Sequence, residues 1–164
     1  MPRCRVDEFS LLTRGLDNQR AHILATVDGL GETQLTTPFS PSGWTPAGLL
    51  QHLALDVECY WFRMVFSGED NARDGDPENA WDVAPGGGLA AVQRYRDECA
   101  LANVVIDSHA PDDEPMAWPD RWGNWRLANL YQMVLHVLTE TSCHTGHMDI
   151  AREFIDGTQH SVIA

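Results

Sequence analysis

The spacing of apolar residues is the feature that most restricts how this chain can fold. In four long stretches, apolar side chains recur every three or four residues, which is the period of a helix with one buried face. These stretches cover residues 7–28, 45–66, 89–108 and 125–155. The alternation typical of strands is weak throughout, and no internal repeat is visible. The sequence therefore predicts an all-α protein, built as a four-helix bundle.

Length and charge narrow the class of protein. A chain of 164 residues predicts one domain, residues 1–164, that is long enough to bury a single core. The formal net charge is −13, with 24 acidic side chains against 11 basic ones. Nucleic acid and anionic membrane surfaces are bound chiefly through clusters of Lys and Arg, so we expect neither as a partner.

Neither the start of the chain nor its cysteines indicates export. The first residues lead into an amphipathic stretch rather than an apolar signal core, and no segment approaches the roughly 20 apolar residues that cross a bilayer. The four cysteines form no CxxC pair and are typical of reduced thiols: Cys4, Cys59, Cys99 and Cys143. We therefore expect a cytoplasmic protein.

Two long connections separate the predicted helices, at residues 69–88 and 110–124. Both are rich in residues that favour loops, and connections of this length are often functional. They carry Trp81, Trp118 and Trp122. These tryptophans either roof a site at one end of the bundle, with Trp118 and Trp122 as candidate substrate contacts, or simply pack beneath the loops.

A stripe of polar residues runs along the last predicted helix. His136, Glu140, His144 and His147 follow one another at spacings of four, four and three, which places them on one side of a helix. Burying a carboxylate without a partner is costly, so an inward-facing Glu140 would need a cation such as a divalent metal. A stripe that faces solvent would need no such explanation. Spacing alone does not decide between the two readings.

His52 is the natural additional donor, because it lies beside the apolar face of the second predicted helix. A histidine in such a place is more often a packed core residue than a metal ligand. Within the stripe, three pairs have the spacing to share a metal ion: His136–Glu140, Glu140–His144 and His144–His147. The remaining histidines lie in polar or terminal surroundings and are expected at the surface: His22, His109 and His160.

Two segments carry a resemblance to a known family: residues 44–53, WTPAGLLQHL, and residues 140–153, ETSCHTGHMDIARE. With them the whole chain resembles the DinB-like superfamily, specifically its DUF664 and mycothiol-dependent maleylpyruvate isomerase branch. Many relatives have His-x-x-x-His on the last helix and one histidine on the second, and the isomerase branch uses a His, Glu, His set. The resemblance implies that His52, Glu140 and His144 are the metal ligands here.

The resemblance also implies an up-down-down-up bundle, often a homodimer, that holds a divalent metal near one end, usually zinc and otherwise nickel. Members with known activity work with low-molecular-weight thiols such as mycothiol or bacillithiol, as transferases or isomerases. The maleylpyruvate isomerase has an additional C-terminal domain that contributes a catalytic arginine. This chain ends soon after its last predicted helix, so maleylpyruvate isomerisation is not expected.

Three protein ligands leave a divalent ion an open coordination position, which is the pattern of catalytic zinc. A thiol that binds there loses its proton and becomes a reactive thiolate, and bound water would be activated by the same field. The leading hypothesis is therefore a metal-dependent thiol transferase or isomerase that acts on a small electrophile, with a metal-assisted hydrolase second. A non-catalytic metal- or small-molecule-binding bundle and a bundle whose polar residues are purely structural are the alternatives.

Three further residues are candidates for roles around the metal. Asp56, four residues after His52, could accept a hydrogen bond from the ligand's second ring nitrogen, or could be an exposed helix partner. His147 could serve as a general base or a substrate contact, or be a packing or surface histidine. Arg152 could bind a substrate carboxylate unless it pairs with Asp149 at i,i+3.

Overall fold

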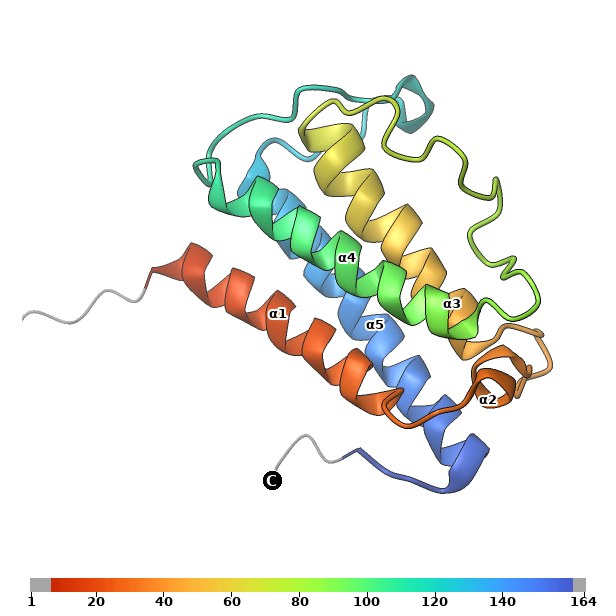
Figure 1. Cartoon of the computed structure of the whole chain (residues 1–164). Coiled ribbons are helices and arrows are strands. Elements are labelled where there is room, and N and C mark those ends of the chain that lie inside the picture. Colours follow the sequence, from red (N-terminus) through yellow and green to blue (C-terminus); the bar gives the residue numbers. More distant parts are fainter. Residues whose placement is uncertain (1–6, 161–164) are drawn as a thin grey trace, which may run out of the picture.

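The computed structural model describes residues 7–160, and this part of the chain contains helices and no strand. Four long helical stretches lie alongside one another (Figure 1). They are α1 (Glu8–Thr26), α3 (Pro46–His52) continued by the π-helix η1 (Leu53–Phe66), α4 (Gly88–Asp107) and α5 (Leu130–Asp156). Two short elements, α2 (Glu32–Thr36) and the 3-10 turn η2 (Asp120–Trp122), lie in the connections. The all-α prediction is confirmed, whereas the order of the bundle stays a prediction.

The ends of the long helices follow signals in the sequence. Asp7 caps α1 by accepting a hydrogen bond from the backbone N–H of Phe9 at 3.2 Å. Thr45 caps α3 through the N–H of Gly48 at 3.0 Å, and Pro46 occupies the first helical position. Gly157 ends α5 in the left-handed region, with φ of 76°.

The helices differ from the predicted ones in one boundary and in one additional helix. The last helix begins at Leu130 and not near residue 125, because the side chain of Asn129 accepts the N–H of Gln132 at 3.1 Å and caps it there. The short helix α2 was not predicted, and it serves to bury Leu35. Both differences concern ends and connections, where the periodic pattern is too short to be read.

The second predicted helix is α-helical only as far as His52, after which η1 continues as a π-helix. A π-helix has i→i+5 hydrogen bonds, and even single π turns are often found at functional sites. All residues of η1 are buried except Asp56, Arg63 and Met64. The apolar residues of this segment keep the three- to four-residue spacing of an ordinary helix, so the sequence does not distinguish the wide helix from an α-helix.

The core is one cluster to which every long helix contributes. α1 packs against α5, η1 packs against both α4 and α5, and α3 packs against α4. Its largest fully buried side chains include Leu16, Phe62, Phe66, Tyr95 and Met133. Cys59 and Cys99 are buried free thiols and Cys143 is an exposed one, while Cys4 lies outside the described residues.

Both long connections are tied to the helices that they cover. Residues 67–87 run from the far end of η1 back along the molecule to the start of α4 (Figure 1). Gln51 holds this segment by donating to the backbone oxygens of Ala80 and Asp82, at 2.8 and 3.1 Å. In the second connection, the N–H groups of Met116 and Ala117 bond to the last turns of η1 at 2.9 and 3.0 Å.

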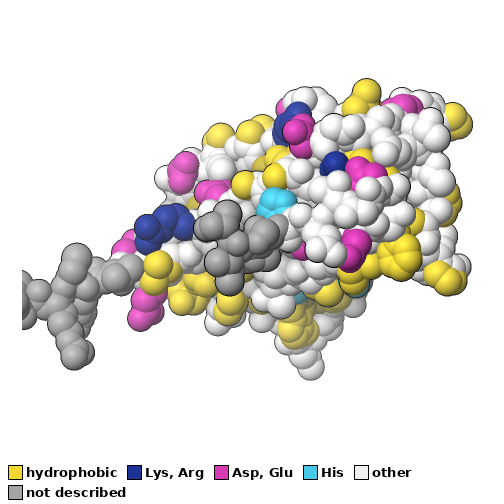
Figure 2. All heavy atoms as spheres, turned by 90° about the horizontal axis from the view of Figure 1, so that it is seen from below, with side chains coloured by type: hydrophobic (Ala, Val, Ile, Leu, Met, Phe, Trp, Pro, Cys, Tyr) yellow, Lys and Arg dark blue, Asp and Glu magenta, His cyan; other side chains and the backbone are white. Residues whose placement is uncertain are grey.

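No helix among the described residues is both long and apolar enough to cross a membrane. On the face of the molecule in Figure 2, acidic side chains are scattered among apolar ones, and the basic side chains form no continuous patch. The expectation that nucleic acid and membranes are not partners stays a prediction.

Candidate functional site

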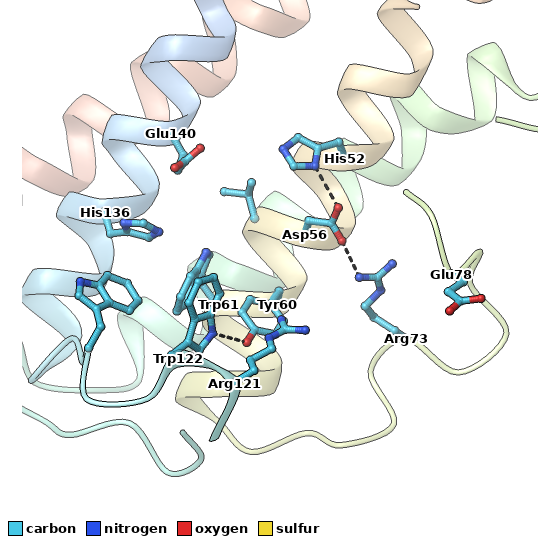
Figure 3. A pocket seen from close by; sticks show the side chains of 12 residues that line it. His52, Asp56, Tyr60, Trp61, Arg73, Glu78, Arg121, Trp122, His136 and Glu140 are labelled. Atoms are coloured by element: carbon cyan, nitrogen blue, oxygen red, sulfur yellow. Dashed lines mark hydrogen bonds and ion pairs between the residues drawn. The ribbon is translucent and has the colours of Figure 1, made fainter. Parts of the chain in front are cut away.

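A cavity of about 690 Å³ lies between η1 and α5, under the two long connections. One wall comes from the end of α3 and from η1, and the other from α5, which contributes His136 and Glu140 (Figure 3). The connections add charged and aromatic side chains at the rim. The lining residues beside those of α5 are His52, Asp56, Val57, Tyr60, Trp61, Arg73, Glu78, Arg121, Trp122 and Trp125.

His52 is held in a fixed orientation at one end of this cavity. Its Nδ1 lies 3.0 Å from Oδ2 of Asp56, and its ring is stacked on that of Trp81 at 4.5 Å. Oδ1 of the same Asp56 accepts a hydrogen bond from Nη1 of Arg73 at 2.6 Å. An ionised carboxylate can only accept, so the neutral tautomer of His52 that fits this contact has its proton on Nδ1 and its lone pair on Nε2.

The charges around Asp56 keep it ionised. Burial favours its neutral form, but the hydrogen bond from His52 and the charge of Arg73 outweigh burial and lower the pKa of the carboxyl group. Asp56 therefore contacts His52 in the way that an orienting role requires. That role itself stays a prediction.

Glu140 and His144 lie across from His52 on α5. Figure 3 shows the side chains of Glu140 and His52 pointing toward one another. Nε2 of His144 is 4.0 Å from Oε2 of Glu140, and its ring meets the ring of His52 edge-on at 5.1 Å. Burial, and after it the charges of the nearby His52 and His147, lower the pKa of His144 to about 4. His144 is therefore a neutral imidazole at neutral pH.

His52, Glu140 and His144 are of residue types that bind divalent metals, and they lie near one another. Neutral imidazoles and a carboxylate are ligands that zinc and nickel accept. Within residues 7–160, however, no three His, Cys, Asp or Glu side chains are gathered closely enough to hold an ion as they stand. The side chain of Glu140 is 44% exposed and has room to turn. The metal site therefore stays a prediction, because the donors are of the right kind but do not share a common point.

The other two histidines of the stripe lie on either side of this pair. His136 lines the cavity with its ring edge-on to Trp61 at 4.7 Å, and burial lowers its pKa although Glu140 opposes the shift. His147 is exposed and does not line the cavity, but its Nδ1 lies 3.4 Å from Nδ1 of His144. The structure thus brings His136 to the cavity and leaves His147 outside it.

Arg152 lies away from the cavity. It donates to the backbone oxygens of Thr26 and Asp28 at 2.6 and 2.8 Å, just past the end of α1, and pairs with Asp156 at 3.0 Å. Asp149, its expected partner, instead bonds Nε2 of His22 at 2.8 Å.

His22 was expected at the surface and is largely covered, with its side chain 11% exposed. It also lies against the ring of His160 at 4.0 Å. His109 and His160 are exposed, as expected.

The two candidate tryptophans differ in position. Trp122 lines the cavity and its Nε1 donates to the hydroxyl of Tyr60 at 2.9 Å. Trp118 is half-buried behind it, 6.0 Å from the ring of Trp61, and does not line the cavity.

Several cavity residues were not found from the sequence. Tyr60 and Trp61 belong to the buried core, and both also line the cavity. Arg73, Glu78 and Arg121 lie in connections, where no periodic pattern indicates the direction of a side chain. The signal available in the sequence was the presence of arginines within two long connections of an acidic chain.

A family model described as mycothiol S-transferase matches residues 11–157 of this chain. No curated protein and no solved structure is detectably similar to it. The match confirms the resemblance to the DinB-like superfamily that residues 44–53 and 140–153 carried. The chain therefore belongs to the mycothiol S-transferase family, within the DinB-like superfamily.

Proposed function

We propose that this protein is a metal-dependent transferase that joins a mycothiol-type thiol to a small electrophile. The observation that carries the proposal is that His52 and Glu140 line a cavity with the volume of a small-molecule site, while His144 lies next to both of them. The match of the chain to the mycothiol S-transferase family supports the thiol as co-substrate.

The proposed ligands of the metal, zinc first and nickel second, are His52, Glu140 and His144. A divalent ion with an open coordination position would lower the pKa of a thiol and so supply the thiolate. Asp56 keeps the proton of His52 on Nδ1, which leaves Nε2 as the donor. The low pKa of His144 leaves its imidazole in the neutral form that ligation needs.

In the proposed reaction, the thiol sulfur forms a bond to an electrophilic carbon of the second substrate. The leaving group departs with the electron pair of its bond, or, where the thiol adds to a double bond, the neighbouring carbon takes up a proton. The thiol proton goes to a base. His136 lines the cavity and is better placed for this than the exposed His147, which contacts His144 from outside.

We also propose the DinB-like four-helix bundle with up-down-down-up order as a single domain. The long 67–87 connection supports this order, because it returns along the molecule before α4 begins (Figure 1). A homodimer and a cytoplasmic location belong to the same proposal, and light scattering on the purified protein tests the dimer.

The proposal is tested by loading the full chain with zinc or nickel and assaying mycothiol transfer to electrophiles. We expect one metal per chain in the wild type, and loss of both metal and turnover in His52→Ala, Glu140→Gln and His144→Ala. His109→Ala is the matched control, because His109 is exposed and bonds its own helix through the backbone oxygen of Val105 at 2.8 Å. Full metal content in the three variants would refute the ligand set. Metal binding without turnover would favour the non-catalytic alternative.

A further inference from the structure

Arg121 is held at the cavity by aromatic rings and not by a carboxylate. Its guanidinium carbon lies 4.6 Å from the ring centre of Tyr60 and 5.5 Å from that of Trp122. The hydrogen bond from Trp122 to the hydroxyl of Tyr60 joins these two rings to one another. Stacking on aromatic faces fixes the plane of a guanidinium while its N–H donors stay free to bind.

Among residues 7–160, Arg121 has no ion-pair partner, although acidic side chains outnumber basic ones by 24 to 11 in the full sequence. The other arginine of the cavity, Arg73, is committed to Asp56 and to the backbone oxygen of Pro77. Five arginines pair with carboxylates: Arg20, Arg63, Arg73, Arg94 and Arg152. Of the two arginines that line the cavity, Arg121 is thus the one whose N–H donors are not used by a carboxylate.

The wall beside Arg121 is aromatic. The ring of Trp61 is stacked with that of Trp122 at 5.8 Å and 30°, and Trp125 meets it at 5.9 Å. Figure 3 shows Arg121 on the side of the cavity away from Glu140. The cavity therefore has an apolar wall between a cationic end and the end where His52 and Glu140 face one another.

From this arrangement, and resting on the proposed function, we propose that the electrophile is a flat aromatic or conjugated molecule that carries a carboxylate or a similar anionic group. Arg121 binds the anion, and the rings of Trp61 and Trp122 lie along the flat body. The reacting carbon then points toward Glu140 and His52. Glu78 also lines the cavity, and its charge disfavours an anion placed beside it.

The test compares two unreactive probes, 2-naphthoate and its neutral amide, by calorimetric titration of the full chain without thiol or added metal. A charge-assisted hydrogen bond contributes roughly 1.5–3 kcal/mol, so the acid should bind about 10-fold tighter than the amide or better. In Arg121→Gln we expect the acid to fall to the affinity of the amide. Unchanged amide affinity in this variant shows that the cavity is still formed.

Arg126→Gln is the matched control. Arg126 also lies over a tryptophan, with its guanidinium carbon 5.9 Å from the ring of Trp118, but it does not line the cavity. It should keep the full preference for the acid. Trp122→Leu should weaken both probes, because it removes the flat surface that they share.

Equal binding of acid and amide to the wild type, no binding of either, or a preserved preference in Arg121→Gln would overturn the inference. These outcomes are independent of the metal and of thiol transfer. A wild type that prefers the acid but never transfers a thiol would contradict only the proposed function. A wild type that transfers thiols without preferring the acid would contradict only this inference.

Discussion

Asp56 binds two cavity residues with its two oxygens, His52 at 3.0 Å and Arg73 at 2.6 Å. One carboxylate therefore joins the candidate ligand on α3 to the connection that follows η1. The pairing of Asp56 with His52 was open to prediction because the two residues are four apart on a helix. Arg73 was not, because nothing in the sequence indicates which helix a loop arginine will meet.

Asp56→Asn should weaken metal binding by about 10- to 100-fold, the usual effect of removing the acceptor behind a histidine ligand. The amide carries no charge, so it no longer balances Arg73 or fixes the proton of His52 on Nδ1. Competition with a chromogenic zinc chelator measures the affinity. Asp74→Asn, an exposed change in the same connection, serves as control. Equal affinities in the two variants would exclude an orienting role for Asp56.

At the scale of elements, Gly48 shows how α3 accommodates its neighbour. A Cβ at this position would lie 2.9 Å from the backbone oxygen of Trp81 and 3.2 Å from Oγ1 of Thr45. The ring of the same Trp81 is stacked on His52. A glycine inside a helix reduces its stability, so its presence here is explained by the close approach of the connection.

Gly48→Ala and Gly146→Ala form a matched pair that tests this explanation. Gly146 lies inside α5 with nothing within 4 Å of its added Cβ, so alanine there should raise the free energy of unfolding by about 0.5–1 kcal/mol. Gly48→Ala should lower it, because the backbone of Trp81 must shift. Urea unfolding of both variants gives the comparison. Equal stabilisation by the two changes would show that the 67–87 connection yields freely.

The elements also mark what sequence periodicity can reveal. Four helical stretches were predicted because their apolar residues repeat at helical spacing over many residues. The change from α3 to the π-helix at Leu53 was missed, because the helical spacing of apolar residues continues across it. The start of α5 was misplaced because it depends on the cap at Asn129 rather than on periodicity.

At the scale of the whole molecule, a buried ion pair joins helices that are distant in sequence. Nε and Nη2 of Arg20 on α1 donate to Oε1 and Oε2 of Glu58 on η1, at 2.7 and 2.6 Å. Arg20 also donates to Asn103 on α4 at 2.6 Å. Glu58 is 0% exposed and Arg20 is 4% exposed, so three helices meet at one desolvated contact.

Glu58→Gln should lower the free energy of unfolding by roughly 3–5 kcal/mol, because it removes the buried counterion of Arg20 and leaves only the exposed Asp17 beside that charge. The double variant Arg20→Met with Glu58→Leu should recover much of this loss, since no buried charge remains. Glu69→Gln, which disrupts the exposed partner of Arg63, should cost less than about 1 kcal/mol. Urea unfolding measures all three. A loss no larger in Glu58→Gln than in Glu69→Gln would contradict the analysis.

Local spacing therefore predicted the helical class, whereas contacts between distant segments were not predictable. Spacing left several pairs within the polar stripe open, and only the family resemblance pointed to His52, Glu140 and His144 as ligands, which stays a prediction. The cavity wall depends on side chains that meet only after folding, such as Tyr60 with Trp122 and Arg73 with Asp56. No sequence pattern indicates these contacts.

The segment between η1 and α4 encloses the cavity with Arg73 and Glu78 and also rests Trp81 upon the ring of His52. A molecule that enters by displacing this segment also displaces Trp81 from the ring of His52. The same segment of backbone thus affects both entry to the cavity and the orientation of His52. A substrate that leaves the segment in place keeps the contact between Trp81 and His52, whereas one that is too large for the cavity breaks it.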